Sequence, residues 1–130
     1  MQAIHVVAGI IWNDSKTELL ISRRPQHLHK GGYWEFPGGK VEADETREAA
    51  LQRELKEELN LSFQRAELFQ RIEHNYPEKS VCLDFFQVYG VNDNVCANEG
   101  QEWRWVALEK LADFRFPEAN QPIVEALICR

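Results

Sequence analysis

Three carboxylates, those of Glu54, Glu57 and Glu58, fall within five residues near the middle of the chain. In a helix, residues three and four apart share a face, so Glu57 and Glu58 both neighbour Glu54 one turn earlier. Glu58 also projects only about 20° from Leu51, a member of the apolar stripe of this helix. The acidic cluster therefore borders the buried face, whereas an ordinary solvated run of charge would lie opposite the leucines.

This cluster predicts a site for a hard divalent cation. Like charges one helical turn apart repel by about a few tenths of a kcal/mol per pair, and by more where burial lowers the dielectric. Oxygen ligands without an accompanying His or Cys suit Mg²⁺, or Mn²⁺, rather than zinc. Mg²⁺ is typically held by a few carboxylates together with waters and substrate phosphates, which indicates phosphate chemistry. The alternative is an acidic helix face balanced by Arg47 and Lys56.

A loop with paired glycines precedes the helix at a fixed spacing. Gly39 is followed after five residues by Glu45, and after seven more by residues 53–55 (Arg-Glu-Leu), one further residue and the glutamates at 57–58. This pattern resembles the Nudix box, the signature of the Nudix hydrolases. One position departs from it, because Asn60 stands where the family has a glycine. Asn tolerates the left-handed conformation of a helix C-cap, so we expect a stability cost below about 1 kcal/mol and no loss of chemistry.

The resemblance implies roles for residues in and around the box. The divalent ions are expected to bind four carboxylates and one backbone carbonyl: Glu54, Glu57, Glu58, Glu99 and Gly39. Glu54, or a near neighbour, is also expected to activate water, and Arg53 to orient Glu54 by a charge-assisted hydrogen bond. Gly38 allows close approach of the backbone to a ligand, and Glu45 is expected to hold the loop in place.

Similarity to one branch of the family extends beyond the box. Four segments resemble the MutT-like branch: residues 6–14 (VVAGIIWND), 21–25 (ISRRP), 34–42 (WEFPGGKVE) and 113–127 (DFRFPEANQPIVEAL). The last is the most informative, because the box is shared by all Nudix enzymes and this segment is not. The resemblance implies hydrolysis of 8-oxo-dGTP to 8-oxo-dGMP and pyrophosphate, which cleanses the nucleotide pool and prevents mutation.

The same resemblance places the substrate-binding residues. Asn120 is expected to read the oxidised purine, since its amide carries both an acceptor and donors. Arg24 matches the position that faces the 8-oxo group, Phe36 the position whose backbone meets the base, and the adjacent Glu35 is included in the site. Taken without the resemblance, Asn120 is a candidate helix cap just before Pro122.

Two alternatives remain open at this point. A Nudix pyrophosphohydrolase of another nucleotide, such as CTP, dCTP or a sugar-linked nucleotide, would share the box and differ at the recognition residues. A Nudix binding module without catalysis, like the domain with which some DNA glycosylases inspect a base, would usually lack some box carboxylates. This chain has all of them.

Composition restricts the partners. The net charge is -6 with a pI near 5.2, which argues against a surface that grips duplex nucleic acid. The three cysteines, Cys82, Cys96 and Cys129, form no CxxC pair, so neither a disulfide framework nor a zinc site is indicated. No apolar run approaches the roughly 20 residues of a membrane span, and residues 1–12 lack a basic leader and a cleavage site. We expect a cytoplasmic monomer whose partner is a small nucleotide.

The elements that must position these residues follow from the apolar pattern. Strands are predicted at residues 3–12, 17–23, 65–74, 80–89 and 102–107. The first two are expected to form an antiparallel hairpin. The third could also be a short helix, and a turn at 75–79 is expected to join it to the fourth. A helix begins after Asp44 or Thr46, either of which can cap it. His27 and His29, in a loop at 26–33, are read as solvated rather than as metal ligands.

The end of the chain is expected to be helical. Residues 107–114 predict a brief helical turn, and an amphipathic helix follows with Pro122 in its first turn. The order of strands, helix, strands and helix predicts one α+β domain over residues 1–130. The resemblance is more specific and implies the Nudix fold, a mixed β-sheet sandwiched between α-helices.

Overall fold

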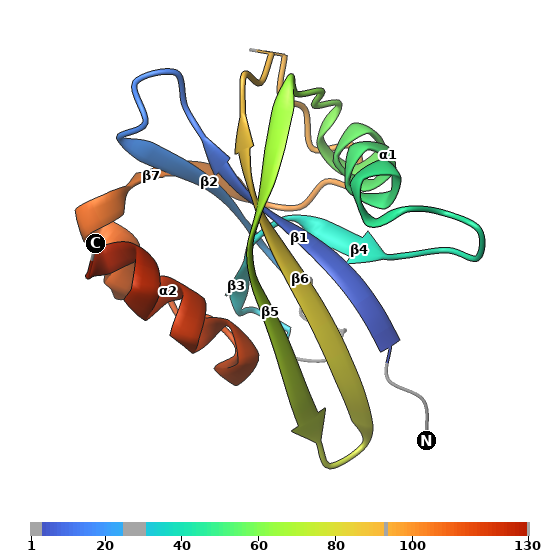
Figure 1. Ribbon diagram of the computed structural model, residues 1–130. Coiled ribbons are helices and arrows are strands. Elements are labelled where there is room, and N and C mark those ends of the chain that lie inside the picture. The colour runs from blue at the N-terminus through green and yellow to red at the C-terminus, as the bar shows by residue number, and fades with distance from the viewer. Residues whose placement is uncertain (1–3, 25–30, 93, 130) are drawn as a thin grey trace.

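Two parallel strands, β1 (Ile4–Trp12) and β6 (Lys79–Tyr89), form the centre of a seven-stranded mixed sheet (Figure 1). The computed structural model describes residues 4–24, 31–92 and 94–129. The other elements, in chain order, are β2 (Glu18–Arg23), β3 (Trp34–Glu35), β4 (Gly38–Lys40), α1 (Arg47–Leu59), β5 (Arg65–Tyr76), β7 (Trp103–Ala107), the 3₁₀ helices η1 (Leu108–Asp113) and η2 (Glu118–Asn120), and α2 (Gln121–Ile128).

The strand order is β3-β2-β1-β6-β5, with β4 paired to β1 and β7 paired to β2. Every pairing apart from that of β1 with β6 is antiparallel. The predicted hairpin of the first two strands is confirmed. Its turn is held by Asn13, whose side-chain oxygen accepts from the backbone N–H groups of Thr17 at 2.9 Å and Glu18 at 3.0 Å.

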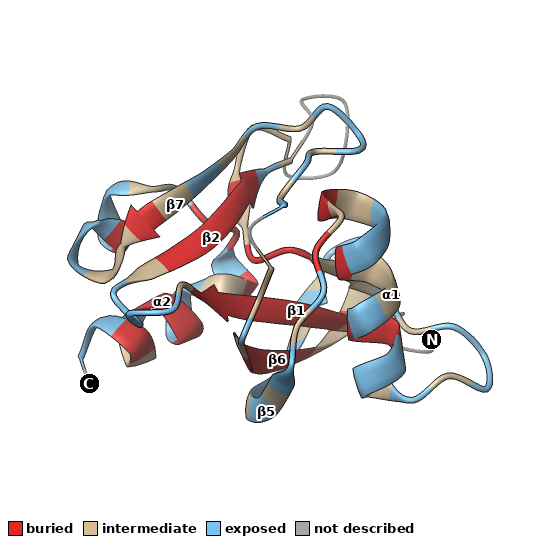
Figure 2. Ribbon diagram, turned by 90° about the horizontal axis from the view of Figure 1, so that it is seen from above, coloured by how far each residue is buried: buried red, intermediate tan, exposed pale blue. Residues whose placement is uncertain are grey.

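The helices lie on opposite faces of the sheet, which confirms the predicted sandwich (Figure 1). Successive side chains of β1 point to opposite faces of the sheet and so contribute to the apolar layer on each face. Val7 and Ile11 pack with the leucines of α1, whereas Ile10 and Trp12 pack with α2 and η1. Figure 2 shows these buried stretches of β1 and β2 between the two helices. Each fully buried leucine or isoleucine contributes about 1.5–3 kcal/mol, so one apolar layer holds α1 against the sheet and the other holds α2.

Helix α1 is capped at both ends by residues that the sequence singles out. The Thr46 hydroxyl accepts from the N–H of Ala49 at 3.1 Å, so Thr46 and not Asp44 is the N-cap. Asn60 adopts the left-handed conformation, with φ 54° and ψ 35°, and its N–H donates to the carbonyl of Lys56 at 3.1 Å. Asn60 thus has the left-handed C-cap conformation that was expected of it, whereas the small stability cost stays a prediction.

The hairpin of β5 and β6 differs from the prediction. Residues 65–74 are a strand and not a short helix, but the strand continues to Tyr76, which pairs with Lys79. The turn is therefore reduced to Pro77 and Glu78, and the predicted turn at 75–79 is wrong, because Asn75 is held in the ladder opposite Ser80.

The C-terminal predictions are confirmed, with η1 over the expected helical turn and Pro122 in the first turn of α2. Strands β3 and β4 and the helix η2 were not predicted. His27 and His29 lie outside the described residues. Within the part of the chain that the structure describes, every helix is too short or too polar to cross a membrane.

Candidate active site

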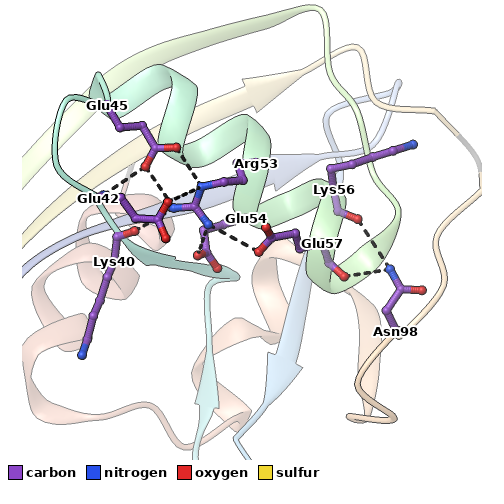
Figure 3. Close-up of polar contacts among 8 residues, drawn as sticks. All are labelled: Lys40, Glu42, Glu45, Arg53, Glu54, Lys56, Glu57 and Asn98. Atoms are coloured by element: carbon purple, nitrogen blue, oxygen red, sulfur yellow. Dashed lines mark hydrogen bonds and ion pairs between the residues drawn. The ribbon is translucent and has the colours of Figure 1, made fainter.

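Arg53 joins the glycine loop to helix α1 (Figure 3). Its guanidinium binds both carboxylate oxygens of Glu45, at 2.7 and 3.0 Å, and donates to the backbone carbonyl of Lys40 at 3.0 Å. The same group donates to Glu54 at 2.8 Å and, more weakly, to Glu57 at 3.4 Å. The hydrogen bonds from Arg53 lower the pKa of Glu45 to about 2. The Glu45 contacts and the orientation of Glu54 are thus the ones expected from the box.

The two glycines of the loop are in close contact with their neighbours: a side chain at Gly38 would meet backbone, and one at Gly39 would displace the carboxylate of Glu54. A Cβ on Gly39 would lie 2.2 Å from a carboxylate oxygen of Glu54, and a Cβ on Gly38 would lie 1.9 Å from the carbonyl oxygen of Val7. Strand β4 pairs with β1 at these residues, so the pairing holds the loop between the sheet and the helix. The backbone at Gly39 therefore lies directly against the carboxylate of Glu54. A backbone carbonyl in this position is close enough to the acidic cluster to share a metal ion with it.

Four carboxylates interact electrostatically at the end of this loop. Burial raises the pKa of Glu58, and a hydrogen bond with Glu54 and the charges of Glu35, Glu54 and Glu99 raise it further. Glu54 is largely buried, whereas Glu57 is 58% exposed and lies at the edge of the cluster. The structure brings Glu54, Glu58 and the distant Glu99 into one site, with Glu35 as a further member.

The loop that carries Glu99 is docked on the C-terminal end of α1. The side chain of Asn98 donates to the carbonyl of Glu57 at 2.8 Å, and the N–H of Asn98 donates to the carbonyl of Glu58 at 2.9 Å (Figure 3). The side chain of Gln101 donates to the same Glu58 carbonyl at 3.4 Å. Carbonyls in the last turn of a helix lack intrahelical partners, so this loop satisfies them and thereby holds Glu99 beside the cluster.

The donor set fits a divalent ion that keeps part of its hydration. In residues 4–24, 31–92 and 94–129, no three His, Cys, Asp or Glu side chains are gathered closely enough to hold a metal ion unaided. Mg²⁺ commonly takes only one or two carboxylates and completes its octahedron with waters and substrate phosphates. A cation would also relieve the repulsion that raises the pKa of Glu58. The assignment of individual ligands stays a prediction.

A cleft of about 240 Å³ runs beside the cluster. Its lining includes all of the residues predicted to bind substrate, together with the glycine loop: Arg24, Glu35, Phe36, Gly38, Gly39 and Asn120. Arg24 donates to Glu35 at 2.8 Å. Burial raises the pKa of Glu35, and the ion pair with Arg24 opposes this effect. Residues far apart in the sequence therefore meet in one cleft, next to the acidic cluster.

Asn120 occupies the N-cap position of α2 without acting as a cap. Its backbone is helical, with φ -91° and ψ -13°, and its side chain makes no capping hydrogen bond. No hydrogen bond of its amide is found among the described residues, although Asn120 lines the cleft. The interpretation of Asn120 as a side-chain helix cap is wrong, because η2 continues directly into α2 and Asn120 has a helical backbone in place of the extended one of an N-cap.

The chain matches the NUDIX domain model over residues 7–126. It belongs to the NUDIX domain family. It is 36% identical over 127 residues to the 8-oxo-dGTP diphosphatase of Escherichia coli K12, with 98% of each chain covered. It is 34% identical to the CTP pyrophosphohydrolase of the same strain, covering 98% of this chain and 93% of that one.

A solved structure of MutT, from work on Aliivibrio salmonicida and Vibrio cholerae, superposes with a TM-score of 0.85 at 44% identity and 98% coverage of both chains. This similarity confirms the family and the fold class expected from the box and the flanking segments. The roles of the individual site residues stay predictions.

Sequence reasoning missed two features of this NUDIX domain. The first is the pair Tyr76 and Lys79, which line the cleft from the β5–β6 hairpin. The predicted turn at 75–79 included both residues, so neither was considered as part of a site. The second is Asp84, which is fully buried and accepts from Arg71 at 2.8 and 3.1 Å and contacts His5 at 2.5 Å and Arg47 at 3.5 Å. An acid inside the apolar segment VCLDFF was the available signal.

The Asp84 cluster connects the first turn of α1 to the sheet. Burial alone would raise the pKa of Asp84, but the hydrogen bonds from Arg71 and His5 outweigh it and lower the pKa to about 2. Arg47, the first residue of α1, reaches the same carboxylate at 3.5 Å. The helix that presents the acidic cluster is therefore fixed at its N-terminal end by charge as well as by apolar packing.

Proposed function

We propose that this NUDIX protein hydrolyses 8-oxo-dGTP to 8-oxo-dGMP and pyrophosphate. The observation that carries the proposal is the amide of Asn120, which lines the same cavity as Arg24 and the glycine loop and has no hydrogen bond to any residue that the structure describes. The relatives named 8-oxo-dGTP diphosphatase and the MutT structure support it.

Recognition of the oxidised base follows from hydrogen-bond chemistry. Oxidation of guanine adds a hydrogen at N7 and a carbonyl at C8, so an acceptor on that edge becomes a donor. The amide of Asn120 offers both an oxygen acceptor and N–H donors, and can therefore match the altered edge. In this proposal Arg24 meets the 8-oxo group and the backbone of Phe36 meets the base. The hydrogen bond from Arg24 to Glu35 at 2.8 Å supports a fixed position for this guanidinium.

Phosphate cleavage is assigned to the acidic cluster. Mg²⁺, with Mn²⁺ as the substitute, would be held by Glu54, Glu57, Glu58, Glu99 and the carbonyl of Gly39. Bound there, divalent ions supply charge neutralisation of the triphosphate and acidification of a water. Arg53 fixes the carboxylate of Glu54 through the 2.8 Å hydrogen bond, so that Glu54 can take a proton from water attacking the β-phosphorus. The products are then the monophosphate and pyrophosphate.

Three broader features complete the proposal: a single domain, a cytoplasmic location and a monomeric state. The NUDIX match covers residues 7–126 of 130, which supports a single domain. Cys82, Cys96 and Cys129 are free thiols, which supports a reducing compartment. The substrate is a small nucleotide, and the acidity of the chain disfavours duplex nucleic acid.

The test is the ratio of kcat/KM values for 8-oxo-dGTP, dGTP and CTP with Mg²⁺, with the products identified. We expect 8-oxo-dGTP to be preferred by about 10³-fold or more, because a site built around specific hydrogen bonds rejects analogues that leave its groups unpaired. A preference for CTP would instead establish the alternative suggested by the CTP pyrophosphohydrolase relative. Equal slow rates on all three would refute the assignment of Asn120 and Arg24.

A further inference from the structure

A second cleft is rich in arginine and shares strand β3 with the first. Its volume is about 520 Å³, and its lining combines guanidinium and aromatic side chains from β2, β3, β7 and the segment after η1: Arg23, Tyr33, Trp34, Arg104, Phe114 and Arg115. None of these residues has a role in the proposed hydrolysis. In a chain of net charge -6, such a concentration of arginine requires an explanation of its own.

The three guanidinium groups are held against aromatic rings. Those of Arg23 and Arg104 lie 5.8 and 5.5 Å from the centre of the Trp34 ring, and that of Arg115 lies 4.6 Å from the centre of the Tyr33 ring. Stacking of this kind covers one face of a guanidinium and leaves its N–H edge for hydrogen bonds. Part of that edge is used within the protein, by the Gly32 carbonyl at 3.0 Å from Arg23 and by Glu102 at 2.9 Å from Arg104. The arginines are therefore oriented before any ligand arrives, which lowers the entropy cost of binding.

The local charges are only partly balanced. Glu102 pairs with Arg23 at 3.4 Å and with Arg104 at 2.9 Å, and these hydrogen bonds lower the pKa of Glu102. Arg115 has no carboxylate within ion-pair distance among the described residues, although Asp113 also lines the cleft. Three cationic groups thus face two carboxylates, and the guanidinium of Arg115 is left to bind an external anion.

We propose that this arginine cleft binds phosphate groups, either those of free pyrophosphate or those of a nucleotide, without a metal ion. Guanidinium matches the tetrahedral oxygens of phosphate through paired N–H donors, and charge-assisted hydrogen bonds of this type are the strong ones. A cavity of about 520 Å³ falls within the range that accommodates small ligands. The proposal does not depend on which nucleotide the acidic site hydrolyses.

Backbone alternation separates this cleft from the candidate active site. Arg23 and Trp34 line the arginine cleft, whereas their neighbours Arg24 and Glu35 line the cleft beside the acidic cluster. The two sites also differ in chemistry, because the acidic cluster repels phosphate unless a cation is present. The first cleft also has cationic lining residues, Arg24, Lys40 and Lys79. Phosphate binding without divalent ions is therefore assigned to the arginine cleft only where the signals of Arg23, Arg104 and Arg115 respond and that of Arg24 does not.

The experiment is a titration of the whole protein with inorganic pyrophosphate in EDTA, followed by the ¹⁵Nε–¹Hε NMR signals of arginine side chains. We expect saturable shifts of Arg23, Arg104 and Arg115. Arg115→Gln should weaken the affinity by about tenfold. Arg65→Gln is the matched control, since Arg65 is likewise exposed and lies 4.4 Å from the ring centre of Tyr89, and it should leave the affinity unchanged. Arg104→Gln provides a second variant within the cleft.

Two outcomes would overturn the proposal, and two further measurements refine it. Equal losses in Arg115→Gln and Arg65→Gln would show only a general charge effect, and the absence of shifts in EDTA would show that no metal-independent site exists. A parallel titration with dGMP distinguishes the source of the phosphate: tighter binding of pyrophosphate favours the free anion, and tighter binding of dGMP favours a nucleotide. Loss of phosphate binding with unchanged nucleotide hydrolysis in Arg115→Gln would separate this inference from the proposed function.

Discussion

Arg53 shows how one residue type organises the site. Its planar fork holds Glu45 through two oxygens, Glu54 through one and the loop carbonyl of Lys40. A lysine could supply the charge but not this set of divergent donors. The orientation of Glu54 and the position of the glycine loop therefore depend on the same guanidinium.

Asn120→Ala tests recognition at the residue scale. We expect kcat/KM for 8-oxo-dGTP to fall by about 10- to 100-fold, the cost of losing one or two hydrogen bonds, with a smaller effect on dGTP. The free energy of unfolding should stay unchanged, because the Asn120 side chain does not cap α2. Steady-state kinetics and chemical denaturation measure the two quantities.

Thr46→Ala is the matched control for Asn120→Ala. Thr46 is a genuine N-cap that accepts from Ala49 at 3.1 Å, so its loss should cost about 1 kcal/mol of stability without changing the preference for the oxidised base. A comparable loss of stability in Asn120→Ala would contradict the role assigned to Asn120.

At the scale of elements, the buried carboxylate of Asp84 predicts an acid sensitivity in the attachment of α1. In the folded protein the pKa of Asp84 is about 2, below the ordinary 3.8. The contribution of its carboxylate to the free energy of unfolding is therefore present above about pH 4 and is lost as the pH falls through 2. The contribution is about 2 kcal/mol at neutral pH. On acidification, the free energy of unfolding of Asp84→Asn should therefore fall by about 2 kcal/mol less than that of the wild type. Chemical denaturation between pH 2 and 7 measures this difference.

Asp14→Asn provides the control for Asp84→Asn, because Asp14 is exposed in the β1–β2 turn. It should follow the wild-type pH profile. Glu45, whose pKa is also about 2, titrates in the same range in every variant, so the difference between profiles isolates Asp84. Identical profiles for Asp84→Asn and wild type would show that the cluster does not stabilise the fold.

These elements also show what sequence could and could not predict. The position of α1, its apolar stripe, Thr46 and Asn60 all depend on local spacing, and the structure has them as expected. Strands β3 and β4, of two and three residues, are too short to show any period. The Asp84 cluster draws partners from β1, β5 and α1, so only the folded topology brings them together. The family resemblance outside the box predicted Glu99, whereas the docking of its loop through Asn98 was visible only in the structure.

For the molecule as a whole, the acidic cluster predicts that divalent ions stabilise the fold and are required for turnover. EDTA should abolish hydrolysis without unfolding the chain. Mg²⁺ at about 100 times its Kd should raise the free energy of unfolding by about 2.7 kcal/mol through linkage. Glu58→Gln should weaken this stabilisation, measured as the shift of Tm with Mg²⁺ concentration.

Glu48→Gln removes an equal charge from the exposed first turn of the same helix and should retain the full Mg²⁺-dependent shift. If both variants lose the shift equally, the stabilisation would reflect the general acidity of the chain and not a defined site.

The shortest strand of the sheet has a consequence for regulation. Trp34 and Glu35 make up the whole of β3, and each lines a different cleft. No residue lies between them, so if an occupant of one cleft displaces β3, we expect the lining of the other cleft to move as well. Any resulting cooperativity must be reciprocal: the factor by which pyrophosphate changes the affinity for nucleotide equals the factor by which nucleotide changes the affinity for pyrophosphate. A two-residue strand would thus let a reaction product modulate the binding of the next substrate molecule.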